Sequence, residues 1–194
     1  GFTSVSEKIG PEQLVSLLSD YLARVTEVVF RNGGTVDKFI GDAVMAIFGA
    51  PKSYGDDAAR AVRTGIEMIQ LADSLGPEWA KVIGAPLKIG VGINSGEAVV
   101  GNIGSEIRSD FTAIGDAVNL ASRLEGLTKE LGVSMLVSEF CAEELDGSPP
   151  LKPVRQVKVI GREAPLLVYV PEEVAPEDLA IESDVAEPYV QGKK

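Results

Sequence analysis

The sequence of 194 residues carries 29 acidic and 18 basic side chains, a net charge of −11, and 45% of its residues are hydrophobic. This balance fits one globular domain and disfavours a surface that binds nucleic acid or anionic lipid by bulk charge. Because the chain contains no histidine, histidine-dependent nucleophiles and HExxH zinc sites are excluded. The remaining carboxylates, amides and cationic side chains suit a hard divalent cation and a phosphorylated substrate.

Two further features bear on the compartment. The single cysteine, Cys141, excludes an internal disulfide and fits a reducing environment, so we expect the cytoplasm. No apolar run approaches the roughly 20 residues of a membrane span. We therefore expect no direct membrane insertion of this segment.

The N-terminal part predicts a helix followed by a hairpin. Apolar residues at helical spacing over residues 11–33, with proline at the start and glycine at the end, predict an amphipathic helix. Residues 35–40 and 43–48 read as strands joined by Gly41 and Asp42, where glycine permits a tight turn.

The middle of the chain predicts a second helix and a second hairpin. A helix capped by Asp56 or Asp57 runs through Leu71, and a loop around Gly76-Pro77 and Gly84 follows it. The β-rich runs at 87–93 and 98–103, on either side of Asn94-Ser95-Gly96, predict a hairpin.

The C-terminal part predicts a third helix over residues 116–132 and a strand over 133–137. A short helix at 139–145 and two strands, 154–160 and 166–170, complete the expected fold. We expect helices on one face of a mixed sheet, which is an α+β architecture.

The last segment differs in composition. Residues 171–194 contain seven acidic residues, two basic residues and three prolines without strong periodicity. We therefore expect one catalytic or binding domain over residues 1–170 and a flexible acidic tail over 171–194.

The first motif that could carry chemistry lies on the first hairpin. Residues 34–42 place Lys38 on a strand and Asp42 in the tight turn, where a carboxylate is free to meet a cation. The plainer interpretation is that Asp42 satisfies turn amides while Lys38 points to solvent.

The second motif spans residues 108–123 and opens the third helix. Asn119 and Arg123 are four positions apart and share a helical face, which could hold a ribose and neutralise charge on a phosphate. The alternative is an ordinary surface pair, with Asp116 as the N-cap.

These motifs, with residues 90–101 between them, resemble the class III adenylyl and guanylyl cyclase domain over residues 1–170, and most closely the bacterial Lys/Thr subgroup often stimulated by bicarbonate. The most specific matches are Phe-Ile-Gly-Asp at 39–42 and Val-Asn-Leu-Ala-Ser-Arg at 118–123. The resemblance implies a ferredoxin-like βαββαβ core with additional strands and helices. It also implies a head-to-tail homodimer whose nucleotide sites lie at the interface, so that neither subunit holds a complete site.

The resemblance also implies roles for individual residues. Asp42 would help to bind two divalent cations, Mg²⁺ or Mn²⁺, and Asn119 would orient the ribose. Arg123 would stabilise the transition state of attack by the 3′-hydroxyl on the α-phosphate. Lys38 and Thr112 match the base-reading positions, where a lysine donor and a threonine acceptor favour ATP over GTP.

Phosphate binding is implied for Phe2, Thr3 and Gly41. In the family, the first strand and the other metal aspartate lie just before the Gly-Phe-Thr motif, so we expect both upstream of Gly1, after a sensor domain that serves signal transduction. A catalytically degenerate cyclase-like module for dimerisation or regulation is the alternative. A diguanylate cyclase would need a GGDEF-type turn, which the sequence lacks.

Overall fold

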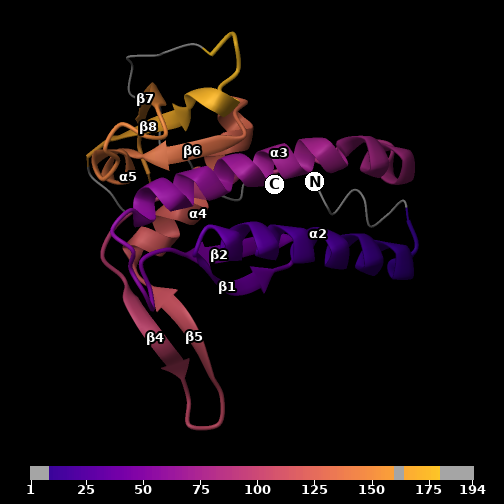
Figure 1. Cartoon of the computed structure of the whole chain (residues 1–194), viewed down its shortest axis with the longest axis horizontal. Helices are drawn as coiled ribbons and strands as arrows, with labels where there is room; N and C mark the ends of the chain where they lie inside the picture. The colour runs from indigo at the N-terminus through magenta and orange to yellow at the C-terminus, as the bar shows by residue number, and fades with distance from the viewer. Residues whose placement is uncertain (1–8, 160–163, 180–194) are drawn as a thin grey trace.

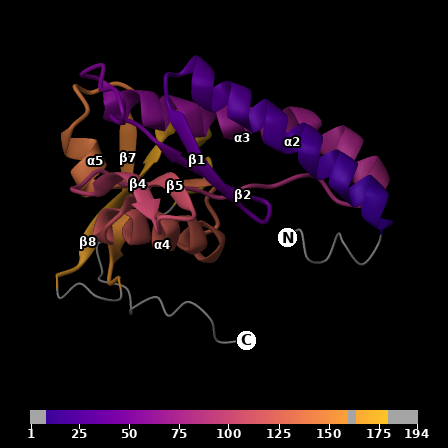
Figure 2. The same ribbon diagram turned by 90° about the horizontal axis from the view of Figure 1, so that it is seen from below.

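The computed structural model describes residues 9–159 and 164–179. Two long helices, α2 (Pro11–Arg31) and α3 (Asp57–Ile83), lie side by side and form one layer (Figures 1 and 2). Their facing apolar stripes bury a cluster of aromatic and aliphatic side chains, consistent with the amphipathic pattern of both sequences.

α3 is longer than the sequence predicts, because the expected loop around Gly76-Pro77 is helical. Proline removes one helical hydrogen bond and strains the preceding turn. Packing on both sides of Pro77 offsets this cost: Trp79, just beyond it, is 2% exposed and meets Tyr21 of α2 edge-on, with ring centroids 6.0 Å apart. The helix ends at Gly84, a residue that the sequence placed in the loop, whose φ of +76° forms a left-handed C-cap.

The first hairpin is confirmed. β1 (Thr35–Ile40) pairs antiparallel with β2 (Ala43–Ile47), and Gly41 and Asp42 form the loop between them. Gly41 has a φ of +64°, which a residue with a side chain rarely adopts. The pairing register shifts by one residue within β1, so Asp37 forms a β-bulge without a partner in β2.

A four-stranded sheet forms the second layer. Its order is β3 (Val91–Ile93), β6 (Met135–Ser138), β8 (Leu166–Pro171) and β7 (Leu151–Val157). β3 is parallel to β6, and the other neighbours are antiparallel. α4 (Asp116–Leu131) packs on β3 and β6 through buried leucines, as its predicted apolar face requires.

The predicted hairpin between residues 87–93 and 98–103 is wrong. β4 (Val99–Gly104) pairs instead with β5 (Ser109–Ile114) along its whole length, and together they project away from the rest of the molecule (Figure 1). After β3 the chain turns toward α4, where Asn94 Nδ2 donates a hydrogen bond to the carbonyl of Ala117 at 3.0 Å. Pairing of β3 with β6 therefore replaces the local pairing that the sequence suggested.

The remaining elements close the end of the sheet. The short helix α5 (Glu139–Glu143) is capped by Ser138 Oγ, which accepts a hydrogen bond from the Cys141 amide. Beyond Val170 the chain continues as a 3₁₀ helix, η1 (Glu172–Val174), and Leu179 packs on the core. Residues 180–194, most of the predicted tail, lie outside the described residues. None of the helices in the described ranges is long and apolar enough to cross a membrane.

Candidate functional site

The two predicted base-reading residues are joined by one carboxylate. Lys38 lies on β1 and Thr112 on β5, and these strands contact each other. Asp37 Oδ2 accepts hydrogen bonds from Thr112 Oγ1 at 2.6 Å and from the Ala113 amide at 3.2 Å. Asp37 Oδ1 lies 3.4 Å from Lys38 Nζ. The structure therefore brings Lys38 and Thr112 together.

The bulge explains how a carboxylate reaches this position. Val36 pairs with Ala46 and Lys38 with Met45, which leaves Asp37 as the extra residue. The Asp37 side chain is 0% exposed, whereas that of Lys38 is 44% exposed. Asp37 was not among the residues that the sequence motifs predicted. An acidic residue among the apolar positions of a strand is the only signal that could have indicated it.

The predicted metal ligand, Asp42, is exposed at the end of the first hairpin. Burial, together with a smaller contribution from the negative charge of Asp42, raises the pKa of Tyr21 to about 12. Burial also raises the pKa of Glu125 on α4, again with a contribution from Asp42. The Asp42 carboxylate thus acts electrostatically on both α2 and α4.

Asn119 and Arg123 lie one turn apart on α4. Asn119 is exposed and Arg123 is partly exposed, and neither side chain has a hydrogen bond or ion pair with any of the described residues. The N-cap of α4 is Gly115 rather than Asp116, which is the first helical residue. Both predicted side chains are therefore free to meet a ligand.

Close contact with β3 fixes the position of this helix. A Cβ atom at Gly92 would lie 2.2 Å from the carbonyl oxygen of Ala121. Only glycine permits so close an approach of strand and helix backbones. Among the described residues, no hydrogen bond or ion pair joins Asp42 to Asn119 or Arg123.

Of the predicted phosphate-binding residues, Gly41 lies in the turn beside Asp42, and Phe2 and Thr3 lie outside the described residues. In the described part of the chain, no group of three or more Cys, Asp or Glu side chains could hold a metal by itself. A cation at Asp42 would need further ligands from a substrate, a partner subunit or another segment.

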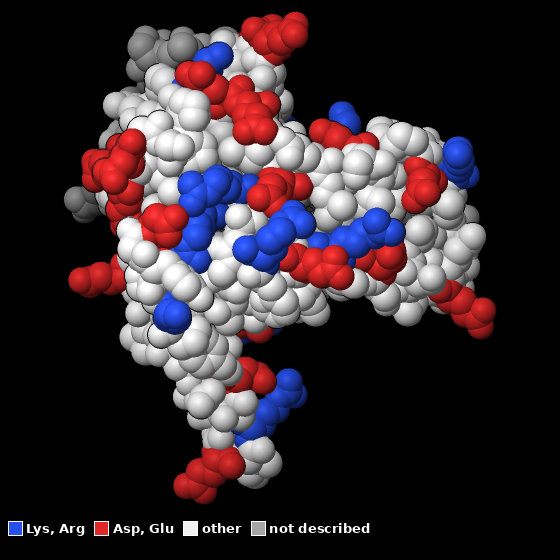
Figure 3. Space-filling view, in the orientation of Figure 1, with Lys and Arg blue, Asp and Glu red and all other residues white. Residues whose placement is uncertain are grey.

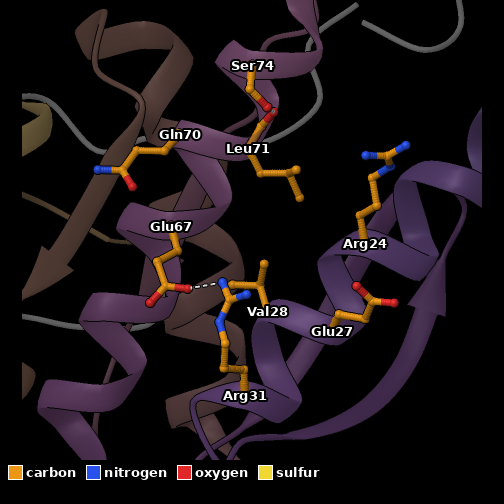
Figure 4. A pocket seen from close by; sticks show the side chains of 8 residues that line it. All are labelled: Arg24, Glu27, Val28, Arg31, Glu67, Gln70, Leu71 and Ser74. Atoms are coloured by element: carbon orange, nitrogen blue, oxygen red, sulfur yellow. Dashed lines mark hydrogen bonds and ion pairs between the residues drawn. The ribbon is translucent and has the colours of Figure 1, made fainter.

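A pocket between α2 and α3 is separate from these residues (Figure 4). Its charged side chains come from both helices, and Arg31 is already paired with Glu67. On the face shown in Figure 3, basic and acidic side chains lie beside one another. Several of the charges on α3 are paired, as Arg63 is with Asp56. Neither feature resembles a site for a polyanion.

Comparison with known proteins identifies the family of the chain. The adenylate and guanylate cyclase catalytic domain family matches residues 1–170. An adenylate cyclase from Anabaena cylindrica is 37% identical over 87% of the chain. The chain spans only 34% of the length of that relative.

Two solved structures are similar over most of both chains. The adenylyl cyclase CyaB from P. aeruginosa has a TM-score of 0.80 and 38% identity, over 87% of each chain. The guanylyl cyclase Cya2 also has a TM-score of 0.80, with 35% identity over 94% of this chain and 92% of its own. These similarities confirm the predicted cyclase fold. The chain belongs to the adenylate and guanylate cyclase catalytic domain family.

Proposed function

We propose that the chain is the catalytic domain of an adenylyl cyclase, which converts ATP to 3′,5′-cyclic AMP and pyrophosphate. The observation that carries the proposal is the placement of Lys38 and Thr112 on either side of the Asp37 carboxylate. An ammonium group donates to the adenine ring nitrogen, and a hydroxyl oxygen accepts from the adenine amino group. Guanine presents the reverse pattern of donors and acceptors, with a ring N–H group and a 6-oxo group. Overall similarity does not decide this point, because an adenylyl and a guanylyl cyclase match the fold equally well.

In the proposed reaction, the ribose 3′-hydroxyl attacks the α-phosphate and pyrophosphate leaves. The Asn119 amide holds the ribose in position for this attack. The Arg123 guanidinium donates hydrogen bonds to the phosphate on which charge accumulates. Gly41, with Phe2 and Thr3, contributes backbone and hydroxyl donors to the remaining phosphates.

Asp42 fits a divalent cation. Its carboxylate is exposed in a tight turn, and Mg²⁺ is commonly bound by one or two carboxylates together with substrate phosphates. Two bound Mg²⁺ or Mn²⁺ ions would lower the pKa of the 3′-hydroxyl and share the charge of the leaving pyrophosphate. Asp42 serves as their ligand, and the base-reading residues hold the purine.

We further propose a homodimer with composite sites. The two hairpins β1–β2 and β4–β5, the second with its connecting loop, expose large apolar side chains, which is typical of a protein interface: Phe39, Ile40, Val99, Ile107 and Ile114. Because no hydrogen bond or ion pair joins Asp42 to Asn119 or Arg123 within the described residues, Asp42 of one subunit serves the Lys38, Thr112, Asn119 and Arg123 of the other. In a longer protein, an upstream sensor domain sets the geometry of this dimer in the cytoplasm and so couples it to a signal.

The direct test is to incubate purified protein with ATP or GTP and with Mg²⁺ or Mn²⁺, and to quantify cyclic nucleotide. A chain extended upstream of Gly1 is assayed in parallel, because the family places a second metal carboxylate there. Cyclic AMP that disappears in Asp42→Ala supports the proposal. Dominant cyclic GMP would contradict the assignment of Lys38 and Thr112, and no product from either length would favour a regulatory module.

A further inference from the structure

The hydroxyl proton of Thr112 is already committed within the protein. A threonine hydroxyl has one proton to donate and two lone pairs that accept. Thr112 Oγ1 donates to Asp37 Oδ2 at 2.6 Å, and Thr112 is only 6% exposed. What remains for a ligand is the pair of acceptor positions on the oxygen.

Asp37 is held in the accepting state by its surroundings. The Ala113 amide donates to the same Oδ2 atom, and Lys38 Nζ lies near Oδ1. Oδ1 accepts no hydrogen bond from the described residues. Because Oδ2 accepts from both the Ala113 N–H group and the Thr112 hydroxyl, this oxygen offers Thr112 no proton in return.

We infer that Asp37 is a specificity-determining positioning residue, which makes Thr112 an obligatory acceptor and directs Lys38 as a donor toward the purine. The inference rests on the proposed function, because it concerns the same nucleotide site. A free threonine hydroxyl would rotate and bind either a 6-amino or a 6-oxo group. With its proton held by Asp37, Thr112 accepts a hydrogen bond from the amino group of adenine. It has no proton to donate to the oxygen of a 6-oxo purine, which therefore binds less well.

Inosine triphosphate is the sharpest probe, because it carries the 6-oxo group and ring N–H of guanine without its 2-amino group. The measured quantity is the ratio of kcat/KM for ATP to that for ITP. The ratio of dissociation constants (Kd) is also measured for the α,β-methylene analogues of both nucleotides, which report binding without turnover.

Two Asp37 variants of similar size separate the effect of Asp37 on the Thr112 proton from its effect on Lys38. Asp37→Leu frees the Thr112 proton, so the ATP to ITP ratio should fall roughly tenfold, with an absolute rise in kcat/KM for ITP. In Asp37→Asn, the amide oxygen still accepts from Thr112 and Ala113, but its NH₂ group faces Lys38. This variant should keep the ratio within about twofold while kcat/KM falls for both nucleotides. A purely structural role would lower both activities in both variants.

The Thr112 variants keep the inference testable if Asp37→Leu does not fold. Thr112→Val should lower the ratio as Asp37→Leu does, Thr112→Ser should preserve it, and the Asp37→Leu/Thr112→Val double variant should lower it no further than Thr112→Val. A wild-type ratio in folded Asp37→Leu, or in Thr112→Val, would overturn the inference while leaving cyclase activity intact. Analogue binding with the expected ratios but without cyclic product would instead contradict the proposed function alone.

Discussion

The Cα atom of Gly92 on β3 lies so close to α4 that a Cβ atom there would sit 2.3 Å from the backbone nitrogen of Glu125. Backbone atoms cannot move aside as a flexible side chain can. Because α4 carries Asn119 and Arg123, the contact sets how far these side chains stand from the sheet. The same glycine is thus important for both stability and the site.

Replacement of Gly92 by alanine should push α4 away from β3. We expect Gly92→Ala to lower the free energy of unfolding by about 2–3 kcal/mol, measured by urea denaturation, and to reduce kcat. Gly101→Ala on β4 is the matched control, since a Cβ atom there meets nothing within 4 Å. Equal stability of the two variants would show that α4 is not held by this contact.

Arg123 should matter for turnover and not for folding. Without a hydrogen bond or ion pair to the described residues, Arg123→Ala should change unfolding by no more than about 0.5 kcal/mol. Loss of the proposed transition-state donor should lower kcat by roughly 100-fold. Arg63→Ala, which breaks an exposed pair with Asp56 at the N-cap of α3, should retain full activity. A large loss of stability in Arg123→Ala would assign this residue a structural role.

Lys38 should affect both substrate use and stability. Lys38→Met removes the proposed donor to the adenine ring, so kcat/KM for ATP should fall at least roughly tenfold. It also leaves the buried Asp37 carboxylate without its cation, at a cost of about 1 kcal/mol because Lys38 itself is partly exposed. The exposed Lys88 provides the control, and Lys88→Met should change neither quantity. Unaltered ATP turnover in Lys38→Met would remove this residue from the site.

The buried thiol of Cys141 should make stability depend on pH in the alkaline range. Burial raises its pKa from 9.0 to about 11. The folded chain therefore keeps a proton that the unfolded chain releases, and the free energy of unfolding falls as pH rises from about 9 to about 11, by up to roughly 1.4 kcal/mol per pH unit. Below this range the contribution is fully present. Urea denaturation between pH 8 and 11 should show a shallower decline in Cys141→Ala, and identical slopes would contradict the assignment.

Local patterns predicted several elements because local chemistry determines them. Proline at position 11 and apolar spacing indicated α2, and Gly41 with Asp42 indicated the β1–β2 hairpin. Gly132, with a φ of +67°, ended α4 where expected. Each of these signals depends on a few neighbouring residues, and tertiary packing did not override them.

Contacts between distant segments could not be read in this way. The sequence predicted the wrong partner for β4, because residues 109–114 carry a motif and do not stand out as a strand. Pro77 was expected to end α3, but the helix continues through it to Ile83, where the burial of Trp79 stabilises the last turns. Asp37 was missed because its role depends on a bulge and on Thr112, which lies 75 positions away. The motifs thus indicated Lys38 and Thr112, while only the fold revealed what joins them.

The most direct test of the account is to mix two catalytically impaired variants, Asp42→Ala and Arg123→Ala. Both are made in the chain, as given or extended upstream of Gly1, that shows cyclase activity. If the site is built from both subunits, the mixture contains heterodimers in which one of the two sites is intact, and about a quarter of the wild-type rate of cyclic AMP formation should return after subunit exchange. Each variant alone should show no more than about one hundredth of the wild-type rate. Failure of the mixture to recover activity, under conditions where size exclusion shows exchanged dimers, would contradict a composite adenylyl cyclase site.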